Sequence, residues 1–218
     1  ETLDSATLFA HRPPAVSAPM NIDLDSLSSF RLTHPERIVY PQDGVTKMGL
    51  ATYFGRVAGW LLPHLINRPL ALVRCPQGVN EHCFFQKNPF QGMPASVHCP
   101  EIAAPGKTTQ HPLVVHDLEG LLALIQFGTV EIHTWGCQTD RPDRPDTITF
   151  DLDPDEGLPF IQVCDAAIEI RDLLANLDLI GFLKTTGGKG LHIVVPLSRH
   201  STWGDIGQFC DAFGKRLL

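Results

Sequence analysis

The chain has 218 residues, of which 43% are hydrophobic and 19% are charged, and its formal net charge is −7. This length suits one domain or a compact pair of domains, with enough apolar side chains for a buried core. No apolar run approaches the length of a membrane span, and no basic and then apolar leader opens the chain, so we expect no membrane association.

Residues 1–29 are rich in Pro, Ser and Ala and show no sustained hydrophobic period, so they are predicted to be a linker or flexible arm. Hydrophobic periodicity predicts a mixture of helices and strands in the rest of the chain, residues 30–218. In chain order the expected elements are a helix at residues 47–61, strands at 70–74 and 83–86, a loop or irregular strand at 88–111, a strand at 113–116, a helix at 118–127, strands at 130–135 and 147–152, a helix at 161–177, strands at 182–185 and 192–197, and a helix up to residue 218.

The predicted helix ends follow from capping chemistry. Thr46, Asp117 and Ser201 are expected to cap the first, second and last helices, and Pro63 is expected to end the first. Because strands and helices are mixed without strict βαβ alternation, the sequence predicts the α+β class.

The charges are distributed unevenly along the chain. Residues 31–87 contain seven Lys or Arg against three Asp or Glu, whereas residues 117–178 contain three against fourteen. A basic lobe would suit phosphate groups and an acidic region would suit metal ions, although ordinary variation of surface charge is the alternative.

The six cysteines show no C-x-x-C pair and no disulfide-like regularity. We therefore expect reduced thiols in a cytoplasmic protein. A zinc site at His82-Cys83 or His98-Cys99 is disfavoured, because the spacing matches no common zinc site.

Two segments carry candidate chemistry. Asp151 and Asp153 lie at the end of the strand at 147–152. Their carboxylates point to one face and suit Mg²⁺ or Mn²⁺; a polar strand end facing water is the alternative. The segment Thr185-Thr-Gly-Gly-Lys-Gly-Leu-His192 has the glycines, the Thr186 hydroxyl and the Lys189 charge of a phosphate-binding loop, or of a glycine-rich hairpin. Together they predict metal-assisted phosphoryl or nucleotidyl transfer.

Six collinear segments resemble the polymerase domain of bacterial ligase D, a member of the archaeo-eukaryotic primase superfamily. Besides Phe150-Asp-Leu-Asp-Pro154 and Lys184-Thr-Thr-Gly-Gly-Lys-Gly-Leu-His192, they are Leu32-Thr-His-Pro-Glu-Arg-Ile-Val-Tyr-Pro41, Arg68-Pro-Leu-Ala-Leu-Val-Arg-Cys-Pro76, Phe84-Phe-Gln-Lys-Asn88 and Glu131-Ile-His-Thr-Trp135. The resemblance implies a primase-like core of mixed or antiparallel sheets flanked by helices. It also implies a template-directed nucleotidyltransferase that fills or extends broken DNA ends in bacterial non-homologous end joining, using two Mn²⁺ or Mg²⁺ ions.

The resemblance assigns roles residue by residue. Asp151 and Asp153 would be the catalytic metal ligands, and the nucleotide would be held by His133, Thr186, Lys189 and His192. Arg37 and Lys47 would grip the 5′-phosphate of a DNA end, with help from Arg74 and Lys87, and the Phe84-Phe85 pair would stack on a template base. The implied partners are 5′-phosphorylated DNA ends, NTP or dNTP, ligase and nuclease domains of the same polypeptide, and the Ku end-binding protein, at the nucleoid in the cytoplasm.

One departure from the family pattern opens alternatives. Relatives carry a third metal-binding aspartate beyond the last helix, whereas Asp205 and Asp211 fall inside the last predicted helix. We therefore expect a catalytic domain that is incomplete at its C-terminal end. The alternatives are a non-catalytic module that binds DNA ends and a haloacid-dehalogenase-like phosphatase, in which Asp151 would be the nucleophile and Asp153 the acid/base.

Overall fold

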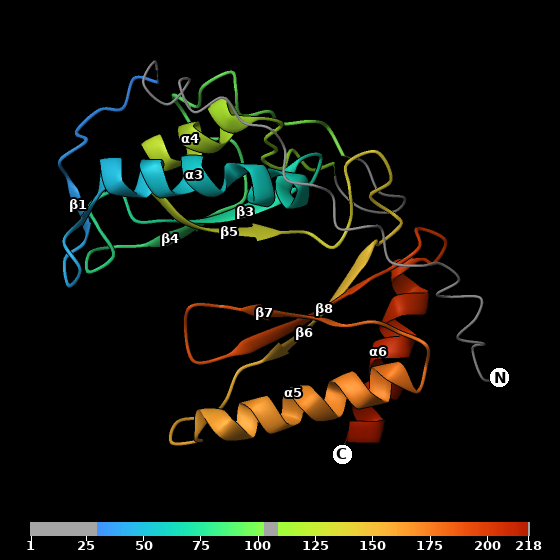
Figure 1. Ribbon diagram of the computed structural model, residues 1–218. Coiled ribbons are helices and arrows are strands. Elements are labelled where there is room, and N and C mark those ends of the chain that lie inside the picture. The colour runs from blue at the N-terminus through green and yellow to red at the C-terminus, as the bar shows by residue number, and fades with distance from the viewer. Residues whose placement is uncertain (1–29, 103–108, 218) are drawn as a thin grey trace. The chain divides into compact units, whose positions relative to one another are not determined.

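The computed structural model describes residues 30–102 and 109–217 (Figure 1), and these divide into two compact units. The N-terminal unit consists of the described residues up to Asp140, and the C-terminal unit of those from Arg141 onward. The predicted linker or arm at residues 1–29 lies outside the described residues. None of the helices in the described ranges is both long enough and apolar enough to cross a membrane.

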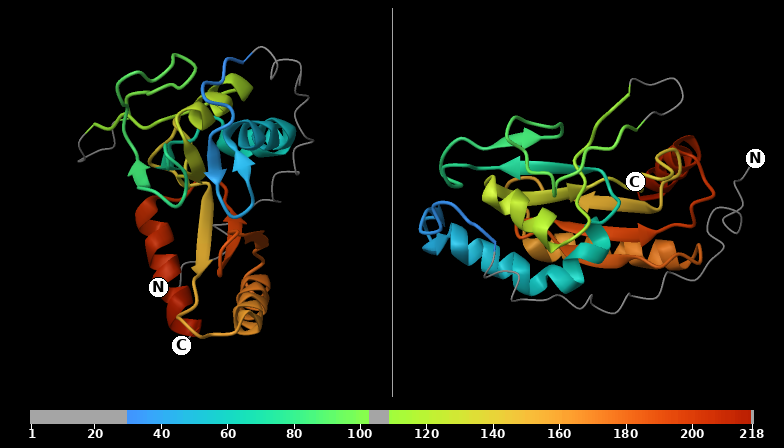
Figure 2. Two further views of the ribbon diagram at one scale, coloured as in Figure 1. Left: turned by 90° about the vertical axis from the view of Figure 1, so that its left-hand side faces the viewer. Right: turned by 90° about the horizontal axis from the view of Figure 1, so that it is seen from above.

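The N-terminal unit is built on a three-stranded antiparallel sheet in the order β4-β3-β5. Its strands are β3 (Leu70–Arg74), β4 (Phe84–Gln86) and β5 (Thr129–Thr134). The unit also contains α3 (Lys47–Leu65), α4 (Leu118–Gln126) and a small ladder of β1 (Ile38–Tyr40) with β2 (Val45–Thr46). Two further views of these elements are given in Figure 2.

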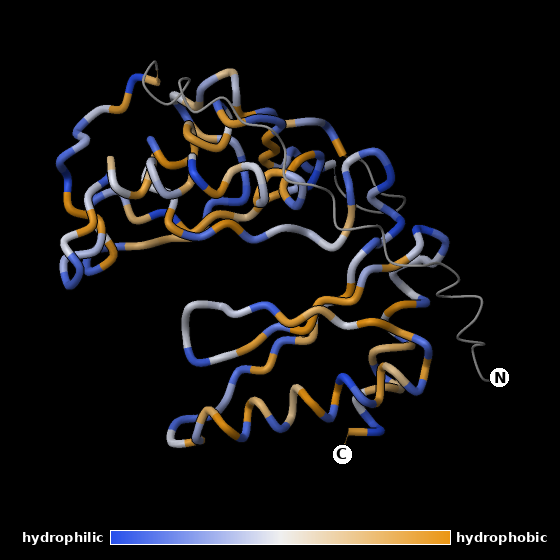
Figure 3. The backbone as a smooth tube through the Cα atoms, in the orientation of Figure 1, coloured by the Kyte–Doolittle hydropathy of each residue, from blue (hydrophilic) through white to orange (hydrophobic). Residues whose placement is uncertain are grey.

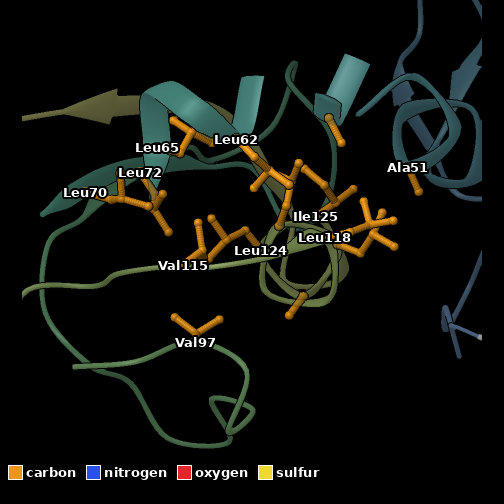
Figure 4. Close-up of a cluster of buried hydrophobic side chains, with 14 of the residues drawn as sticks. Ala51, Leu62, Leu65, Leu70, Leu72, Val97, Val115, Leu118, Leu124 and Ile125 are labelled. Carbon is orange, nitrogen blue, oxygen red and sulfur yellow. The ribbon is translucent and has the colours of Figure 1, made fainter. Parts of the chain in front are cut away.

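The sheet and both helices enclose one apolar core. Leu70 and Leu72 alternate along β3 and are at most 1% exposed, as the two-residue period of a strand requires. They belong to the same buried cluster as Leu62 of α3 and Leu124 of α4, which are drawn in Figure 4. This burial leaves Ala71 and Val73 on the opposite face of β3, where they pair with His133 of β5 and Phe85 of β4.

Capping predictions hold for both helices of this unit, but Pro63 does not end α3. The Thr46 hydroxyl accepts a hydrogen bond from the backbone N–H of Gly49, and the Asp117 carboxylate accepts one from Gly120. Pro63 lies in the last turn of α3, where the missing N–H costs one hydrogen bond, and the helix continues to Leu65.

The prediction of a strand at residues 113–116 is wrong. Leu113 and Val114 form isolated bridges to two different partners, Leu70 and His98, so no ladder develops. The apolar run reflects burial instead, because Leu113, Val114 and Val115 are at most 1% exposed. Described residues within 88–111 form no named strand, which confirms the prediction of an irregular segment.

The C-terminal unit has its own antiparallel sheet, in the order β6-β8-β7. Its strands are β6 (Thr147–Leu152), β7 (Phe182–Thr185) and β8 (Leu191–Pro196), and its helices are α5 (Phe160–Ala175) and α6 (Trp203–Leu217). Helix α5 buries one side chain per turn against the sheet, and Leu174 is fully buried. In Figure 3 the loop between β7 and β8 is hydrophilic to neutral, in contrast to the apolar stretches of β8. The α+β class and the antiparallel sheets flanked by helices are confirmed.

The prediction that Ser201 caps the last helix is wrong, because the cap is Thr202. The Thr202 backbone N–H donates to the Asp205 carboxylate at 2.7 Å, and the Asp205 N–H donates to the Thr202 hydroxyl at 3.3 Å. This reciprocal pair is a capping box, and its hydrogen bonds from the Thr202 backbone and hydroxyl lower the pKa of Asp205. Ser201 is buried instead of capping the helix.

Candidate functional site

The end of β6 presents two carboxylates. Asp151 lies in the strand and Asp153 is the first residue beyond it, with side chains 66% and 67% exposed. Ile148, Phe150 and Leu152 alternate with them and pack in or against the core of the unit, so the acids share the opposite face. The sequence predicted this shared face correctly.

Strand register brings a histidine to the first acid. Asp151 pairs with His192 across the β6–β8 ladder, and His192 Nε2 lies 3.4 Å from Asp151 Oδ1. The two residues are far apart in the chain, so it is the antiparallel pairing that places the imidazole beside the carboxylate.

The loop between β7 and β8 brings a lysine to the second acid. Lys189 Nζ lies 3.6 Å from Asp153 Oδ1 and donates a hydrogen bond of 2.7 Å to the carbonyl of Pro154. Asp151, Asp153, Lys189 and His192 therefore form one charged cluster at this end of the sheet. We call it the acidic cluster.

Glycines in the same loop allow close approach to β6. Gly187 has a φ of 83°, which L side chains rarely adopt, and a Cβ on Gly190 would lie 2.6 Å from the carbonyl oxygen of Leu152. The Thr186 hydroxyl donates to the carbonyl of Gly190 and accepts from the N–H of Gly188. Thr186 thus shapes the loop, with its hydroxyl hydrogen-bonded inside it.

The donor chemistry of the acidic cluster fits a divalent hard cation, but only in part. Asp151 and Asp153 offer carboxylate oxygens, the ligands that Mg²⁺ and Mn²⁺ prefer. Within residues 30–102 and 109–217, no group of three or more His, Cys, Asp or Glu is arranged to hold a metal ion. Any ion held here would need further oxygen ligands from water or from a substrate phosphate.

A basic cavity lies in the N-terminal unit. Its volume is about 160 Å³, and its lining includes Arg37, Lys47 and Arg74. Lys47 is the first residue of α3 and is only 6% exposed; its Nζ donates to the carbonyl of Thr33 at 2.9 Å and to Gln126 Oε1 at 3.0 Å. Arg37 Nη1 donates to the carbonyl of Pro76 at 2.7 Å. The structure thus brings together three cations that the sequence had grouped only by resemblance.

The environment of Lys47 changes its ionisation. Burial, and secondarily the positive charge of Arg37, lower the pKa of Lys47 from 10.5 to about 8. The ammonium group is therefore mostly charged at pH 7 but loses its proton in mildly alkaline solution.

Arg74 and Lys87 occupy different settings. The Arg74 guanidinium lies over the ring of Phe90 at 4.2 Å and near the rings of Phe84 and Phe127, and its Nε donates to the carbonyl of Phe127. Burial lowers the pKa of Arg74 from its usual value. Lys87 follows β4, is exposed, and is not among the residues that line the basic cavity.

The open face of the β4-β3-β5 sheet carries an aromatic pair. The Phe85 ring is 65% exposed and lies 5.9 Å from the ring of His133, whose Nε2 is 3.0 Å from Glu131 Oε2. Phe84 is half-buried beside Arg74, so the two adjacent rings lie on opposite faces of β4, as the two-residue period of a strand requires. His133 belongs to this unit and is placed here with Phe85.

The structure adds residues that the sequence did not indicate. Gln126, at the end of α4, forms hydrogen bonds with both Thr33 and Lys47. It lies 79 positions from Lys47 in the chain, and no local pattern signals such a contact.

Cys75 and Cys83 form a disulfide, so the expectation that all six cysteines are reduced is wrong for this pair. Cys75 directly follows Arg74, and Cys83 directly precedes Phe84. Because Arg74 and Phe84 are partners in the β3–β4 register, the ladder brings the two sulfurs together.

Comparison with known proteins identifies the relationship. A family described as the primase-polymerase domain of LigD matches residues 46–218. The chain belongs to this family. Its relatives in the LigD family include the multifunctional non-homologous end joining protein LigD of Pseudomonas aeruginosa, 37% identical over 87% of this chain and 22% of that protein. The LigD of Mycolicibacterium smegmatis is 36% identical over 80% of this chain and 23% of that protein.

A solved structure of the LigD family has the same fold. The polymerase domain of Mycobacterium tuberculosis ligase D, solved in complex with DNA, matches with a TM-score of 0.79 and 28% identity, over 86% of this chain and 68% of that chain. This chain spans about a fifth to a quarter of the length of the two LigD proteins above. Membership of the LigD family removes the support for a haloacid-dehalogenase-like phosphatase.

Proposed function

We propose that this chain is a template-directed nucleotidyltransferase that fills or extends broken DNA ends in bacterial non-homologous end joining. The observation that carries the proposal is the acidic cluster, in which two exposed carboxylates face a lysine and a histidine from the neighbouring hairpin. Membership of the LigD primase-polymerase family supports the class of reaction.

Asp151 and Asp153 would hold Mn²⁺ or Mg²⁺ through their carboxylate oxygens. The bound ions would supply charge stabilisation of the phosphates and activation of the primer 3′-hydroxyl, the two contributions of a two-metal site. Asp153 forms an exposed ion pair with Lys189. A metal ion could replace Lys189 as the partner of Asp153 at little cost in free energy, because an ion pair this exposed contributes little to stability.

Lys189 and His192 would then bind the triphosphate. Both are held beside the acids by the hairpin between β7 and β8, which places positive charge where phosphate oxygens would lie. Thr186 would act by holding the shape of the hairpin, and His133 would contact the nucleotide from the face that carries Phe85.

The N-terminal unit would bind the DNA end. Arg37 and Lys47 line a cavity suited to a terminal 5′-phosphate, and Arg74 completes the basic wall. The exposed ring of Phe85 would stack on a template base, an interaction worth roughly 1–3 kcal/mol per base. Lys87, exposed beside β4, would contact the DNA backbone.

The proteins that this chain resembles support a proposal about its partners. The M. tuberculosis structure was solved with DNA, and the relatives are described as multifunctional end-joining proteins. We infer that ligase and nuclease domains of the same polypeptide and the Ku protein work with this chain, at the bacterial nucleoid.

Primer extension on a gapped duplex with Mn²⁺ or Mg²⁺ tests the catalytic proposal. Asp151→Ala and Asp153→Ala should each lower nucleotide addition by about two orders of magnitude or more, because each removes a ligand of the ions that would stabilise transition-state charge. DNA binding should persist. Asp155→Ala, which removes an exposed acid from the following turn, is the control and should leave addition unchanged. Extension by either variant of the acidic cluster at the parent's rate would refute the metal assignment.

The second candidate is a DNA-end-binding module without catalysis. The observation in its favour is that no third metal-binding side chain joins Asp151 and Asp153 among the described residues. Such a module would bind a 5′-phosphorylated end but add no nucleotide with either metal ion.

Binding of the 5′-phosphate is tested separately from catalysis. A gapped duplex with a 5′-phosphate should bind about tenfold tighter than its 5′-hydroxyl counterpart, since a hydrogen bond to a charged group contributes about 1.5 kcal/mol or more. Arg37→Ala combined with Lys47→Ala should erase that ratio while leaving nucleotide affinity unchanged. Equal affinity of the parent for the two duplexes at moderate salt would make the basic cavity a general backbone contact.

A further inference from the structure

The disulfide between Cys75 and Cys83 closes the loop that joins β3 to β4. Cys75 comes directly after Arg74, the last residue of β3, and Cys83 directly before Phe84, the first residue of β4. The antiparallel register that pairs Arg74 with Phe84 leaves the two cysteines facing each other, with their Cα atoms 4.4 Å apart.

This loop holds one wall of the basic cavity. The Pro76 carbonyl accepts the 2.7 Å hydrogen bond from Arg37, and Cys75 and Pro76 both line the cavity that contains Lys47. The N–H of Val79 bonds to the carbonyl of Val39 at 2.9 Å, which ties the loop to β1. The covalent bridge thus restrains the segment that orients Arg37.

The two sulfur atoms differ in access. Cys75 is 3% exposed, whereas Cys83 is only partly buried. An incoming thiolate would therefore attack the sulfur of Cys83 and release the Cys75 thiolate, leaving a mixed disulfide on Cys83. A second thiol would then displace Cys83. In total, one protein disulfide and two small thiols give two protein thiols and one small-molecule disulfide, and two electrons enter the protein.

We propose that Cys75 and Cys83 are a redox-active pair that exchanges with small thiols, and that the oxidised pair strengthens binding of a 5′-phosphate in the basic cavity. Disulfides that meet cytosolic thiols are commonly transient or redox-sensing, and a chain acting on bacterial chromosomal DNA meets that thiol pool. Opening the bridge returns conformational freedom to the loop, so the Pro76 carbonyl no longer holds Arg37 in one place. The exposure of the pair to this thiol pool rests on the proposed function in bacterial end joining, and the binding part of the inference rests on the proposed role of Arg37 and Lys47.

The test compares the protein after treatment with oxidised glutathione and after treatment with dithiothreitol. Alkylation and mass measurement should find four reactive thiols in the oxidised form and six in the reduced form when both are unfolded, since four of the six cysteines are free. Reduction should raise hydrogen–deuterium exchange of the loop amides, such as Gly78 and Val79, about tenfold. It should lower the preference for 5′-phosphate over 5′-hydroxyl duplex about fivefold, as expected for one weakened hydrogen bond, and reoxidation should restore the preference.

Three variants separate the bridge from other thiols. Cys83→Ser breaks the bridge at its accessible end and should behave like the reduced protein, with no response to dithiothreitol. Cys75→Ala with Cys83→Ser repeats this without leaving a new thiol. Cys99→Ser removes a partly buried thiol of the same unit outside the bridge and should keep the full response.

Two results would overturn the proposal. One is a loop exchange rate and a phosphate preference that stay the same when alkylation shows that the bridge has opened, which would leave a purely structural disulfide. The other is six reactive thiols after oxidation. An oxidised protein that does not distinguish the two duplexes would instead refute the proposed role of the basic cavity; unchanged loop exchange would then overturn the redox inference independently.

Discussion

At the scale of single residues, burial and neighbouring charge decide how each group of the candidate sites behaves. Asp151 and Asp153 are exposed, and their carboxylates meet Lys189 and His192 at 3.4–3.6 Å, so they can exchange partners readily. Lys47 is in the opposite situation, because its ammonium group is buried between Thr33 and Gln126. Its charge is therefore the more sensitive to conditions.

This difference predicts a pH dependence of DNA-end binding. The pKa of Lys47 is about 8, and the group is charged below that value, so the preference for a 5′-phosphorylated duplex should fall as the pH rises through 8 and above. A terminal phosphate keeps its second charge over this range, since its pKa is about 6, and a bound phosphate would move the midpoint upward. Lys47→Arg, which stays charged, should flatten the profile of the affinity ratio.

Unfolding would not explain such a loss. Lys47 has a lower pKa in the folded chain, about 8, than the 10.5 of an exposed lysine, so between these values the unfolded chain binds more protons. Its contribution to stability therefore rises with pH over this window. Thermal unfolding measured from pH 7 to pH 10 is the control, and a preference that is constant across that range would contradict the role of Lys47.

At the scale of elements, the hairpin of β7 and β8 positions the acidic cluster by close packing on β6. The ladder sets Asp151 opposite His192, and Gly190 lets the turn approach the Leu152 carbonyl more closely than a side chain would allow. The cap of α6 occupies another acid of the same unit. Asp205 is hydrogen-bonded to Thr202, so its carboxylate is not offered to the acidic cluster as a third metal ligand.

Gly190→Ala should separate the hairpin from β6. The new Cβ would lie 2.6 Å from a backbone oxygen, so something must shift, and we expect a loss of about 1–3 kcal/mol in the free energy of unfolding together with weaker nucleotide binding. Gly188→Ala is the matched control, since its Cβ would meet only the Thr186 hydroxyl at 3.7 Å. Chemical denaturation of both variants makes the comparison, and equal stabilities would show that the close approach is unimportant.

At the scale of the whole molecule, the described chain has two cores that share no residue. One core is formed by α3, α4 and the β4-β3-β5 sheet, and the other by α5, α6 and the β6-β8-β7 sheet. The proposed end-binding residues belong to the first unit and the acidic cluster to the second. Binding and catalysis would thus depend on different cores.

Leu174→Ala should weaken the unit that carries the acidic cluster. Leu174 is fully buried in α5, and such a truncation typically costs about 2–5 kcal/mol. Trp203 belongs to the same unit, whereas the other two tryptophans, Trp60 and Trp135, belong to the N-terminal unit. In a Trp60→Phe, Trp135→Phe background, the fluorescence transition of Trp203 should move to lower denaturant. Leu124→Ala, the equivalent change in the other core, should move it less; a larger shift from Leu124→Ala would contradict the assignment.

The sequence by itself determined the features that depend on neighbours in the chain. Helical and strand periods placed β3, β6 and β7 at their observed bounds, and the caps Thr46 and Asp117 were readable because a cap bonds to a group only three residues away. The shared face of Asp151 and Asp153 follows in the same way from the two-residue period of a strand. Resemblance within short motifs was enough to indicate the LigD primase-polymerase family.

Only the tertiary structure decided which distant groups meet. The pairing of Asp151 with His192, of Lys47 with Gln126 and of Cys75 with Cys83 depends on ladder register and helix packing, which no local period encodes. The buried run at residues 113–115 was misread as part of a strand for the same reason, because an apolar run shows burial but not the partner that would make it a strand. The pKa of Lys47 likewise follows from desolvation, and desolvation exists only after the core has formed around it.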